Sequence, residues 1–312
     1  MAQSSFVLGD TEPTRANSGA GTDGHAYPSL VVGDGTGSVT VKAGTVLSDR
    51  IIRGWVNIEP GATLRNCVVT GADVATFGRA LVNVTVPGTW DGTSQAVIDH
   101  CTIQPLASTR RQGYAAGVGN RYYRLTRSLV LDCVDGATVA GTDTAAKVEI
   151  SGSYISDLMH LVPDPWAARP DTHNDCVQLH GAQNQHDVSD VMLVGSSFDA
   201  RISPAADPLG PSGSTTRSIT AVVLTKPTGP HSSLRVDSCW MRGGEQTLNA
   251  ADSSITATVS VTGTRWERGK ADGGNPEDGI PHVAAFVSRA ANLTWTDNTW
   301  FSGGAAQPIR VS

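Results

Sequence analysis

A short pattern of apolar and small polar residues recurs along the chain. Each copy has an apolar residue, two polar or turn-forming residues, a small residue, any residue, and a second apolar residue. The copies are Leu64–Val69, Ile98–Ile103, Leu125–Val130, Ile150–Ile155, Leu193–Phe198, Val236–Met241, Val261–Trp266 and Trp295–Trp300. No window of ten or more residues shows a sustained helical period, so the pattern indicates repeated short strands.

The spacing of the copies predicts a solenoid. The small residue falls at positions 67, 101, 128, 153, 196, 239, 264 and 298, in steps of 34, 27, 25, 43, 43, 25 and 34 residues. A repeat of roughly 25 residues suits one three-strand turn of a solenoid, and the longer steps are turns that carry loops. Since alternate side chains of a strand face inward, the apolar positions would stack into one core. We therefore predict an all-β, single-stranded right-handed parallel β-helix.

The cysteines and tryptophans of the repeat fit its interior. Cys67, Cys101 and Cys239 share the small-residue position with serine, threonine and asparagine, and no CxxC spacing indicates a zinc site. Trp266 and Trp300 occupy the last apolar position, where Val69 and Phe198 stand in other copies. Both sets are predicted to be structural.

A second family of strands precedes the repeat in the later turns. It aligns the segments that begin at Thr138, Val177, Val222, Gln246 and Ala284. In this register Val177 and Leu179 point inward, while Gln178, His180 and Thr225 line one outer face. Residues 39–312 form the predicted β-helix. Residues 1–38, rich in Gly, Ser, Thr and Asp, are predicted to form an extended N-terminal arm and a cap.

Composition and charge narrow the possible partners. The chain has 34 Gly, 16 Pro, 17% charged residues and a net charge of −6, which favours strands and turns and disfavours nucleic acid as a partner. No run of 18 apolar residues predicts a membrane span. The first residues lack the basic and apolar segments of a signal peptide, so export by that route is not expected.

Candidate chemistry gathers in the two 43-residue steps. Their insertions, His160–Thr172 and Asp199–Thr216, follow equivalent strands and are expected to form one wall. Asp171, His173 and Asp175 alternate along the chain between them. Three interpretations remain open: a general acid–base set for glycan cleavage, a calcium site, or side chains that close a tight turn.

Other residues complete this candidate site. Lys226, next to Thr225, is a candidate base or a group that neutralises a substrate carboxylate, although a lysine at a strand end is commonly solvated. Trp166 would stack on a sugar ring or anchor its own loop. Gln178, His180, Trp166 and Thr225 are therefore the candidate substrate-binding residues. No cofactor is expected unless the carboxylates hold Ca²⁺.

The segment DTHNDCVQLHG resembles a family of pectate-lyase-like β-helix proteins found among secreted actinobacterial proteins and minor tail proteins of their phages. The family signature T-H-x-D-x-x-Q is matched by Thr172, His173, Asp175 and Gln178. Its later N-W-x-x-G-G element is matched loosely from Ser238, and the resemblance extends over residues 36–302. The Gly-His-Gly and Arg-Ile-Lys segments of polygalacturonase-type hydrolases are absent.

The resemblance implies a phage virion protein of the minor tail or tail tip. It would bind a host-surface polysaccharide and contact other tail proteins, and cleavage of the glycan is an open question. A homotrimer is a candidate assembly, since β-helix tail proteins are often trimers. One alternative is an extracellular polysaccharide lyase or glycoside hydrolase that acts on an acidic or cell-wall glycan. Another is a purely structural decoration protein of the virion.

Overall fold

The computed structural model describes most of the chain. It covers residues 11–72, 80–106, 115–140, 145–159, 161, 172, 174–180, 188–200, 219–225, 232–242, 247–250, 258–267, 285–289 and 291–311, with the backbone alone at 180, 219–225, 286, 288 and 309–311. Every regular element in these segments is a β-strand. They contain no helix of the length and hydropathy that crossing a membrane requires.

The strands form three parallel sheets. Sheet A contains β1 (Leu30–Val32), β4 (Arg50–Arg53), β7 (Val68–Gly71), β10 (Thr102–Ile103), β13 (Leu129–Leu131), β16 (Tyr154–Ser156), β19 (Ser197–Asp199), β22 (Trp240–Arg242), β25 (Arg265–Trp266) and β28 (Thr299–Trp300). Sheet B contains β2 (Ser38–Val41), β5 (Trp55–Ile58), β8 (Ala80–Val84), β11 (Ala116–Gly119), β14 (Asp135–Ala140), β17 (Asn174–His180), β20 (Ile219–Thr225), β23 (Leu248–Ala250), β26 (Ala285–Ser288) and β29 (Pro308–Val311). Sheet C contains β3 (Val46–Ser48), β6 (Thr63–Arg65), β9 (Ala96–Asp99), β12 (Tyr123–Thr126), β15 (Val148–Ser151), β18 (Val191–Val194), β21 (Ser233–Asp237), β24 (Thr258–Thr262) and β27 (Asn292–Thr296).

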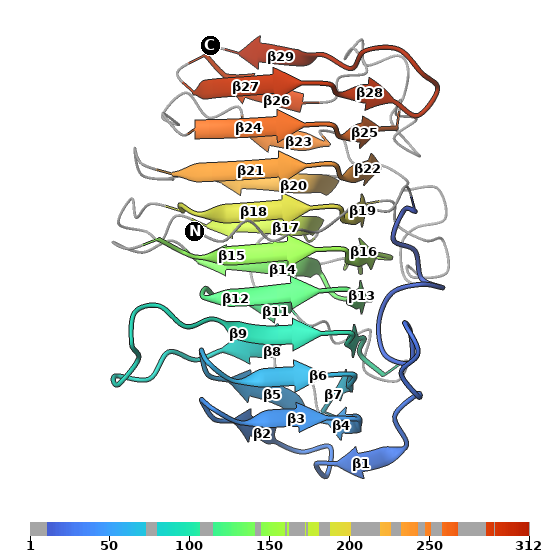
Figure 1. The fold of residues 1–312 in the computed structure, drawn as a ribbon, viewed down its shortest axis with the longest axis vertical. Coiled ribbons are helices and arrows are strands. Elements are labelled where there is room, and N and C mark those ends of the chain that lie inside the picture. Colours follow the sequence, from blue (N-terminus) through green and yellow to red (C-terminus); the bar gives the residue numbers. More distant parts are fainter. Residues whose placement is uncertain are drawn as a thin grey trace.

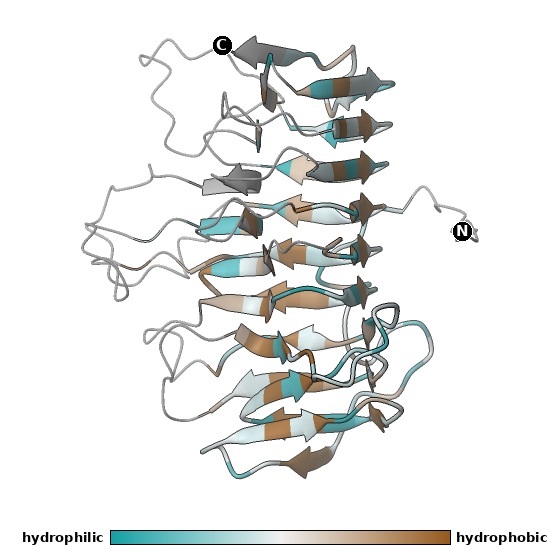
Figure 2. Ribbon diagram, turned by 90° about the vertical axis from the view of Figure 1, so that its left-hand side faces the viewer, coloured by the Kyte–Doolittle hydropathy of each residue, from teal (hydrophilic) through white to brown (hydrophobic). Residues whose placement is uncertain are grey.

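Each turn of the chain, called a coil here, passes through sheets C, A and B in that order. The coils stack from the blue end to the red end of Figure 1 and wind with a right-handed sense. Apolar and polar positions alternate along many of the strands in Figure 2, and the apolar ones form one continuous core. The predicted right-handed parallel β-helix is confirmed.

The stacking predicted from the repeat is also confirmed. Ile103 is paired with Val69 and Val130, and the column continues in register to Trp266 and Trp300. The pattern missed one earlier coil, β3–β4–β5, because Arg50 occupies the position where other coils carry a small residue.

The sequence alignment of the second strand family was wrong by one or two residues for the strands on either side of Val177 and Val222. Val177 and Val222 are neighbours as predicted, but their partners are Ala137 and Leu248 instead of Thr138 and Gln246. Leu248 pairs in turn with Ala285, whereas the alignment placed Phe286 opposite it. Since strand register is set by hydrogen bonds between coils, one or two residues of difference in the preceding loop escape a sequence alignment.

A hydrogen-bonded ladder follows the bend between sheets C and A. The residue before each small residue has a positive φ, as at Asn66, Arg127 and Gly152. Behind this bend the small side chains are buried and linked from coil to coil. The backbone N–H of Ser128 donates to Ser153 Oγ at 3.1 Å, and that of Ser153 donates to Ser196 Oγ at 3.1 Å. Small polar side chains are needed here because each one satisfies a buried amide of the coil below.

Replacing Ser153 by alanine tests this ladder. The Ser128 amide would lose its buried acceptor, so we expect the free energy of unfolding to fall by about 1–3 kcal/mol. Ser153→Cys is the matched control, because buried thiols occupy the same position in other coils, as at Cys101 and Cys239. Urea denaturation followed by circular dichroism measures both variants. Equal losses in the two variants would contradict the role assigned to the acceptor.

An N-terminal arm, residues 11–27, lies on the outer face of sheet A. It enters beside β22, where Glu12 forms an ion pair with Arg242, and Arg15 contacts Asp157 beyond β16 at 2.8 Å. Further on, the Gly19 amide donates to the Arg127 carbonyl at 2.9 Å. A Cβ at Gly19 would lie 2.5 Å from Thr102 Oγ1, so only glycine allows this approach. The arm thus runs antiparallel to the stack before β1 begins, as the blue trace in Figure 1 shows.

Candidate functional site

The candidate site lies where sheet A passes into sheet B, at strands β14 and β17. The connections 157–173 and 200–218 both leave sheet A and enter sheet B on adjacent coils, as the sequence predicted. Four of the candidate residues lie outside the described part of the chain: Asp171, His173, Lys226 and Trp166. The structure therefore places Asp175, Gln178, His180 and Thr225.

Asp175 lies beside a second carboxylate that the sequence did not indicate. It is 3% exposed, and its backbone N–H donates to Oδ1 of Asp135, 3.0 Å away in the coil below. Asp135 is 9% exposed. Adjacent strands are about 4.8 Å apart, which brings the two residues into neighbouring positions of one column. The spacing of 40 residues between them hid this pair in the sequence.

Thr172 and Asn174 support the structural interpretation of the segment. The Asn174 amide donates to the carbonyls of Val134, at 3.0 Å, and Met159, and its oxygen accepts from the Thr172 hydroxyl at 3.1 Å. The Thr172 backbone N–H also donates to the Leu161 carbonyl at 3.0 Å, and the Leu161 N–H donates to the Thr172 hydroxyl at 2.9 Å. These buried contacts fasten both ends of the 157–173 connection to the coil. Thr172 and Asn174 of the segment DTHNDCVQLHG therefore hold the 157–173 connection in place.

Cys176 is not available as a nucleophile. It is fully buried between Asp175 and Val177, and burial raises the pKa of its thiol well above the usual value. The negative charges of Asp199, Asp175 and Asp135 raise this pKa further. Because the thiolate is the reactive form, the thiol stays protonated and inert at neutral pH.

The outer face of sheet B carries the remaining candidates in register. Gln178 is half-buried and pairs with Thr138 on one side, and His180 pairs with Thr225 on the other. The predicted stacking of His180 with Thr225 is thus confirmed for the backbone. The sheet presents equivalent positions at intervals of about 4.8 Å, close to the length of one sugar residue in an extended chain.

The calcium interpretation involves three residues, of which the structure describes only Asp175. Among the described residues, no group of three or more His, Cys, Asp and Glu side chains is placed to hold a metal ion. Asp171 and His173, two of the three proposed members, lie outside those residues. A calcium site therefore stays a prediction.

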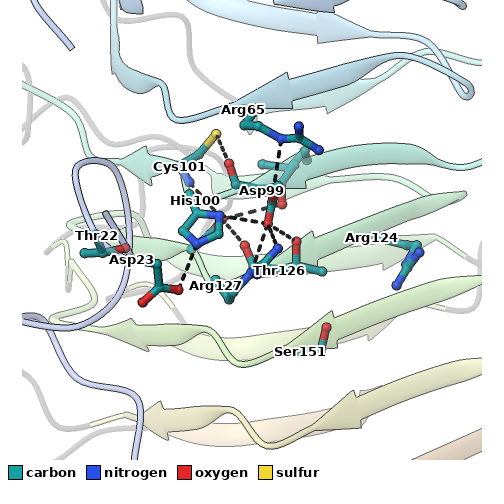
Figure 3. Close-up of polar contacts among 12 residues, drawn as sticks. Thr22, Asp23, Arg65, Asp99, His100, Cys101, Arg124, Thr126, Arg127 and Ser151 are labelled. Atoms are coloured by element: carbon teal, nitrogen blue, oxygen red, sulfur yellow. Dashed lines mark hydrogen bonds and ion pairs between the residues drawn. The ribbon is translucent and has the colours of Figure 1, made fainter. Parts of the chain in front are cut away.

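A second buried charge cluster lies at the bend between β9 and β10 (Figure 3). Asp99 accepts from the Thr126 hydroxyl at 2.7 Å and pairs with Arg127 at 2.9 Å and Arg65 at 3.3 Å. Burial alone would raise the pKa of Asp99, but the Thr126 hydrogen bond and the charges of His100 and Arg127 outweigh it and lower the pKa. The Asp-His pair was visible inside the repeat at Ile98–Cys101, although its partners were not.

This cluster holds the N-terminal arm. The His100 ring is 3% exposed, with Nε2 at 2.9 Å from Asp23 of the arm and Nδ1 at 3.1 Å from Asp99. The His25 ring of the arm lies 4.7 Å from it. Because the imidazole is enclosed by protein on both sides, it is suited to fastening the arm and unsuited to meeting a substrate.

Trp90 anchors its own loop. Its ring lies 3.9 Å from that of Tyr122, and its Nε1 donates to the Ser94 carbonyl at 3.0 Å. The Trp90 side chain is therefore structural. Trp166, the candidate sugar-binding tryptophan, lies outside the described residues.

Comparison with known proteins assigns neither a family nor a function to the chain. No protein-family model matches the chain, and no curated protein matches its sequence.

Proposed function

We propose that this protein binds a polysaccharide along the outer face of sheet B. The observation that carries the proposal is the column of in-register polar positions at Thr138 and Gln178 on the outer face of the sheet. Hydroxyl and amide groups are suitable partners for sugar hydroxyls. The two long connections start and end beside this column, where they would wall a binding groove.

The other faces are less suited to a glycan. The arm covers the outer face of sheet A from β7 to β22. On sheet C, charged groups already pair with one another, since Arg124 lies 3.2 Å from Glu149 and Arg235 lies 2.6 Å from Asp237. Sheet B combines neutral polar groups with flanking loops, which is typical of ligand sites on regular scaffolds.

The wider role we propose is that of a phage minor tail or tail-tip protein whose ligand is a host-surface polysaccharide. The resemblance of DTHNDCVQLHG to pectate-lyase-like tail proteins supports it, and the rigid stack of coils suits a particle surface. Mass spectrometry of purified virions from a phage that encodes the chain would detect its peptides. Their consistent absence would leave an extracellular glycan-binding role.

The second candidate is a polysaccharide lyase or glycoside hydrolase. The Asp135–Asp175 pair favours hydrolysis, because retaining glycosidases place two carboxyl groups roughly 5–5.5 Å apart and the inverting enzymes roughly 6.5–9.5 Å apart. Adjacent coils at about 4.8 Å are closer to the first arrangement. In this role Asp175 and Asp135 would act as acid–base and nucleophile, and the residues Asp171, His173 and Lys226 would assist.

A glycan array followed by titration calorimetry tests the binding proposal. We expect Gln178→Ala and Thr138→Ala each to weaken binding up to about tenfold, the equivalent of one lost hydrogen bond. Ser260→Ala is the matched control, because it removes a hydroxyl from the outer face of sheet C and should leave affinity unchanged.

The same samples separate the alternatives. Release of reducing ends or unsaturated products that Asp175→Asn and Asp135→Asn abolish would identify an enzyme. Binding without release identifies a receptor-binding protein. No binding to any acidic or cell-wall glycan would reject the proposal and favour a structural decoration protein.

A further inference from the structure

Exposed apolar side chains gather at the N-terminal end of the stack. Among the described residues, five large hydrophobic side chains are exposed, and four of them lie in or just before the terminal strands β1 and β3: Tyr27 at 64%, Leu30 at 59%, Val31 at 51% and Val46 at 62%. The lowest strand in Figure 2, which is β1 in Figure 1, is hydrophobic along its whole length. An apolar patch of this kind on a soluble surface marks an interaction site.

The same end presents three strand edges. β1, β2 and β3 are the terminal strands of sheets A, B and C, and no described strand pairs with their outer edges. Their sequences are LVV, SVTV and VLS, without a charge or a proline. Natural sheet edges are usually guarded by such residues, because a free edge pairs readily with another chain. Here nothing in the three strands opposes such pairing.

The C-terminal end is built differently. Residues 301–306 fold back on the last coil, where the Ala306 amide donates to the Asn298 carbonyl at 2.9 Å and Trp295 Nε1 donates to the Ala306 carbonyl at 2.8 Å. The last strand, β29, begins with Pro308 and contains Arg310. The C-terminal end therefore has the proline and the charge that discourage pairing with another strand, and the N-terminal end has neither.

The chain that precedes β1 does not cover the exposed end. Residues 11–27 lead away from it along sheet A, as far as the contact of Glu12 with Arg242 in β22, the eighth strand of that sheet. The arm even leaves Tyr27 exposed at the edge. The described residues that precede β1 therefore leave this end of the stack uncovered.

We propose that the cover is a second copy of this chain, docked head to head across a twofold axis. The strands circulate in one sense around the stack, so a copy turned over by the twofold presents strands that run the opposite way. With the axis through β1, that strand meets its own equivalent, and β2 meets β3 of the other copy. All three contacts are then antiparallel, and the strands match in length at three or four residues each.

The three contact strands place no charge against their copy. The charged side chains near them lie at the bends: Lys42 pairs with Glu59 at 2.7 Å, and Asp34 accepts from the Thr36 hydroxyl at 2.8 Å. Burial of Leu30, Val31, Val46 and Tyr27 against their equivalents adds the apolar contribution to the edge hydrogen bonds. This inference is independent of the proposed glycan-binding role and of the loops that carry it.

Sedimentation velocity on the full chain over a range of concentrations tests the proposal. We expect the wild type to have about twice the chain mass of 32.5 kDa. Leu30→Lys and Val46→Lys should weaken association at least tenfold, because each places a charge in the contact. Phe301→Lys, at the other end and 37% exposed, is the matched control and should associate as the wild type does. Equal circular dichroism melting curves show that the variants fold.

A cysteine at Val31 tests the orientation. Directly opposed antiparallel residues have Cα atoms roughly 4.5–5.5 Å apart, within the range of a disulfide. All five native thiols are buried, so oxidised glutathione should link two Val31→Cys chains while being reduced to glutathione, and should leave Phe301→Cys unlinked. A wild type that stays monomeric would overturn the proposal. So would association that survives Leu30→Lys, or a Val31→Cys protein that does not cross-link.

Discussion

Trp266→Ala should lower the free energy of unfolding by about 3–5 kcal/mol, the range for removing a large aromatic side chain from a core. Trp266 is fully buried, and its ring stacks on that of Trp295 at a centroid distance of 5.3 Å. Its Nε1 also faces Asn298 Oδ1 at 3.5 Å. No neighbour can fill the cavity, because the coils above and below are fixed by their backbone ladders.

The loss of stability in Trp266→Ala should be largest in the C-terminal coils. In a solenoid each repeat contacts only its neighbours, so a local defect first lowers local stability. Hydrogen exchange should show faster exchange in β24 and β27 than in β12, and urea denaturation gives the total loss. Trp300→Ala is the matched control in the same column, and it should cost less because that ring is partly exposed. Equal losses in the two variants would contradict the packing described here.

Asp99→Asn should destabilise the protein by about 2–3 kcal/mol. Breaking a buried charge pair typically costs about 3–5 kcal/mol. We reduce that range because Arg65 and Arg127, at 50% and 44% exposure, can return to solvent. His100, which is 3% exposed, loses the carboxylate beside Nδ1, so its hold on Asp23 and the arm should weaken too.

The pH dependence follows from the direction of the pKa shift. The pKa of Asp99 is lower in the folded protein than the ordinary value of about 3.9. A carboxyl group of this kind adds stability above its unfolded pKa, and that contribution disappears as pH falls through the folded pKa. The stability difference between wild type and Asp99→Asn should therefore be complete at neutral pH and shrink below about pH 4.

Urea denaturation at pH 7 and at pH 3 measures this difference, and limited proteolysis reports whether residues 11–27 are released. Asp190→Asn is the control, since Asp190 is exposed and asparagine tolerates its positive φ. A pH-independent difference would show that the Asp99 charge is not what stabilises the cluster.

The repeat could be predicted residue by residue because one register governs it. A strand that slips by one residue turns its apolar side chains outward, so the positions of Leu64, Ile98 and Leu125 were fixed by their own polarity. The same logic identified Trp266 and Trp300 as interior. It failed at Arg50, where a single atypical residue concealed a coil, and at Leu248, where the preceding connection shifts the register.

The candidate site was harder to predict because its groups come from different coils. Asp175 and Gln178 were recognised within one segment, but Asp135 belongs to the coil below and shares no local motif with them. Contacts between coils depend on which residues the intervening loops bring into register. Which residues of neighbouring coils become partners is therefore known only once the course of the whole backbone is known.

The amino-acid pattern by itself determined that this protein is a β-solenoid with small residues at one bend and apolar columns inside, because polarity alone dictates which side of a strand faces the core. Only the tertiary structure decided where residues 11–27 lie, which carboxylates become neighbours, and which end of the stack keeps bare edges. Those features arise between residues 40 to 230 positions apart, as with Asp135 and Asp175 or Glu12 and Arg242. Long-range contacts of this kind depend on the stacking of complete coils, which no local window of sequence contains.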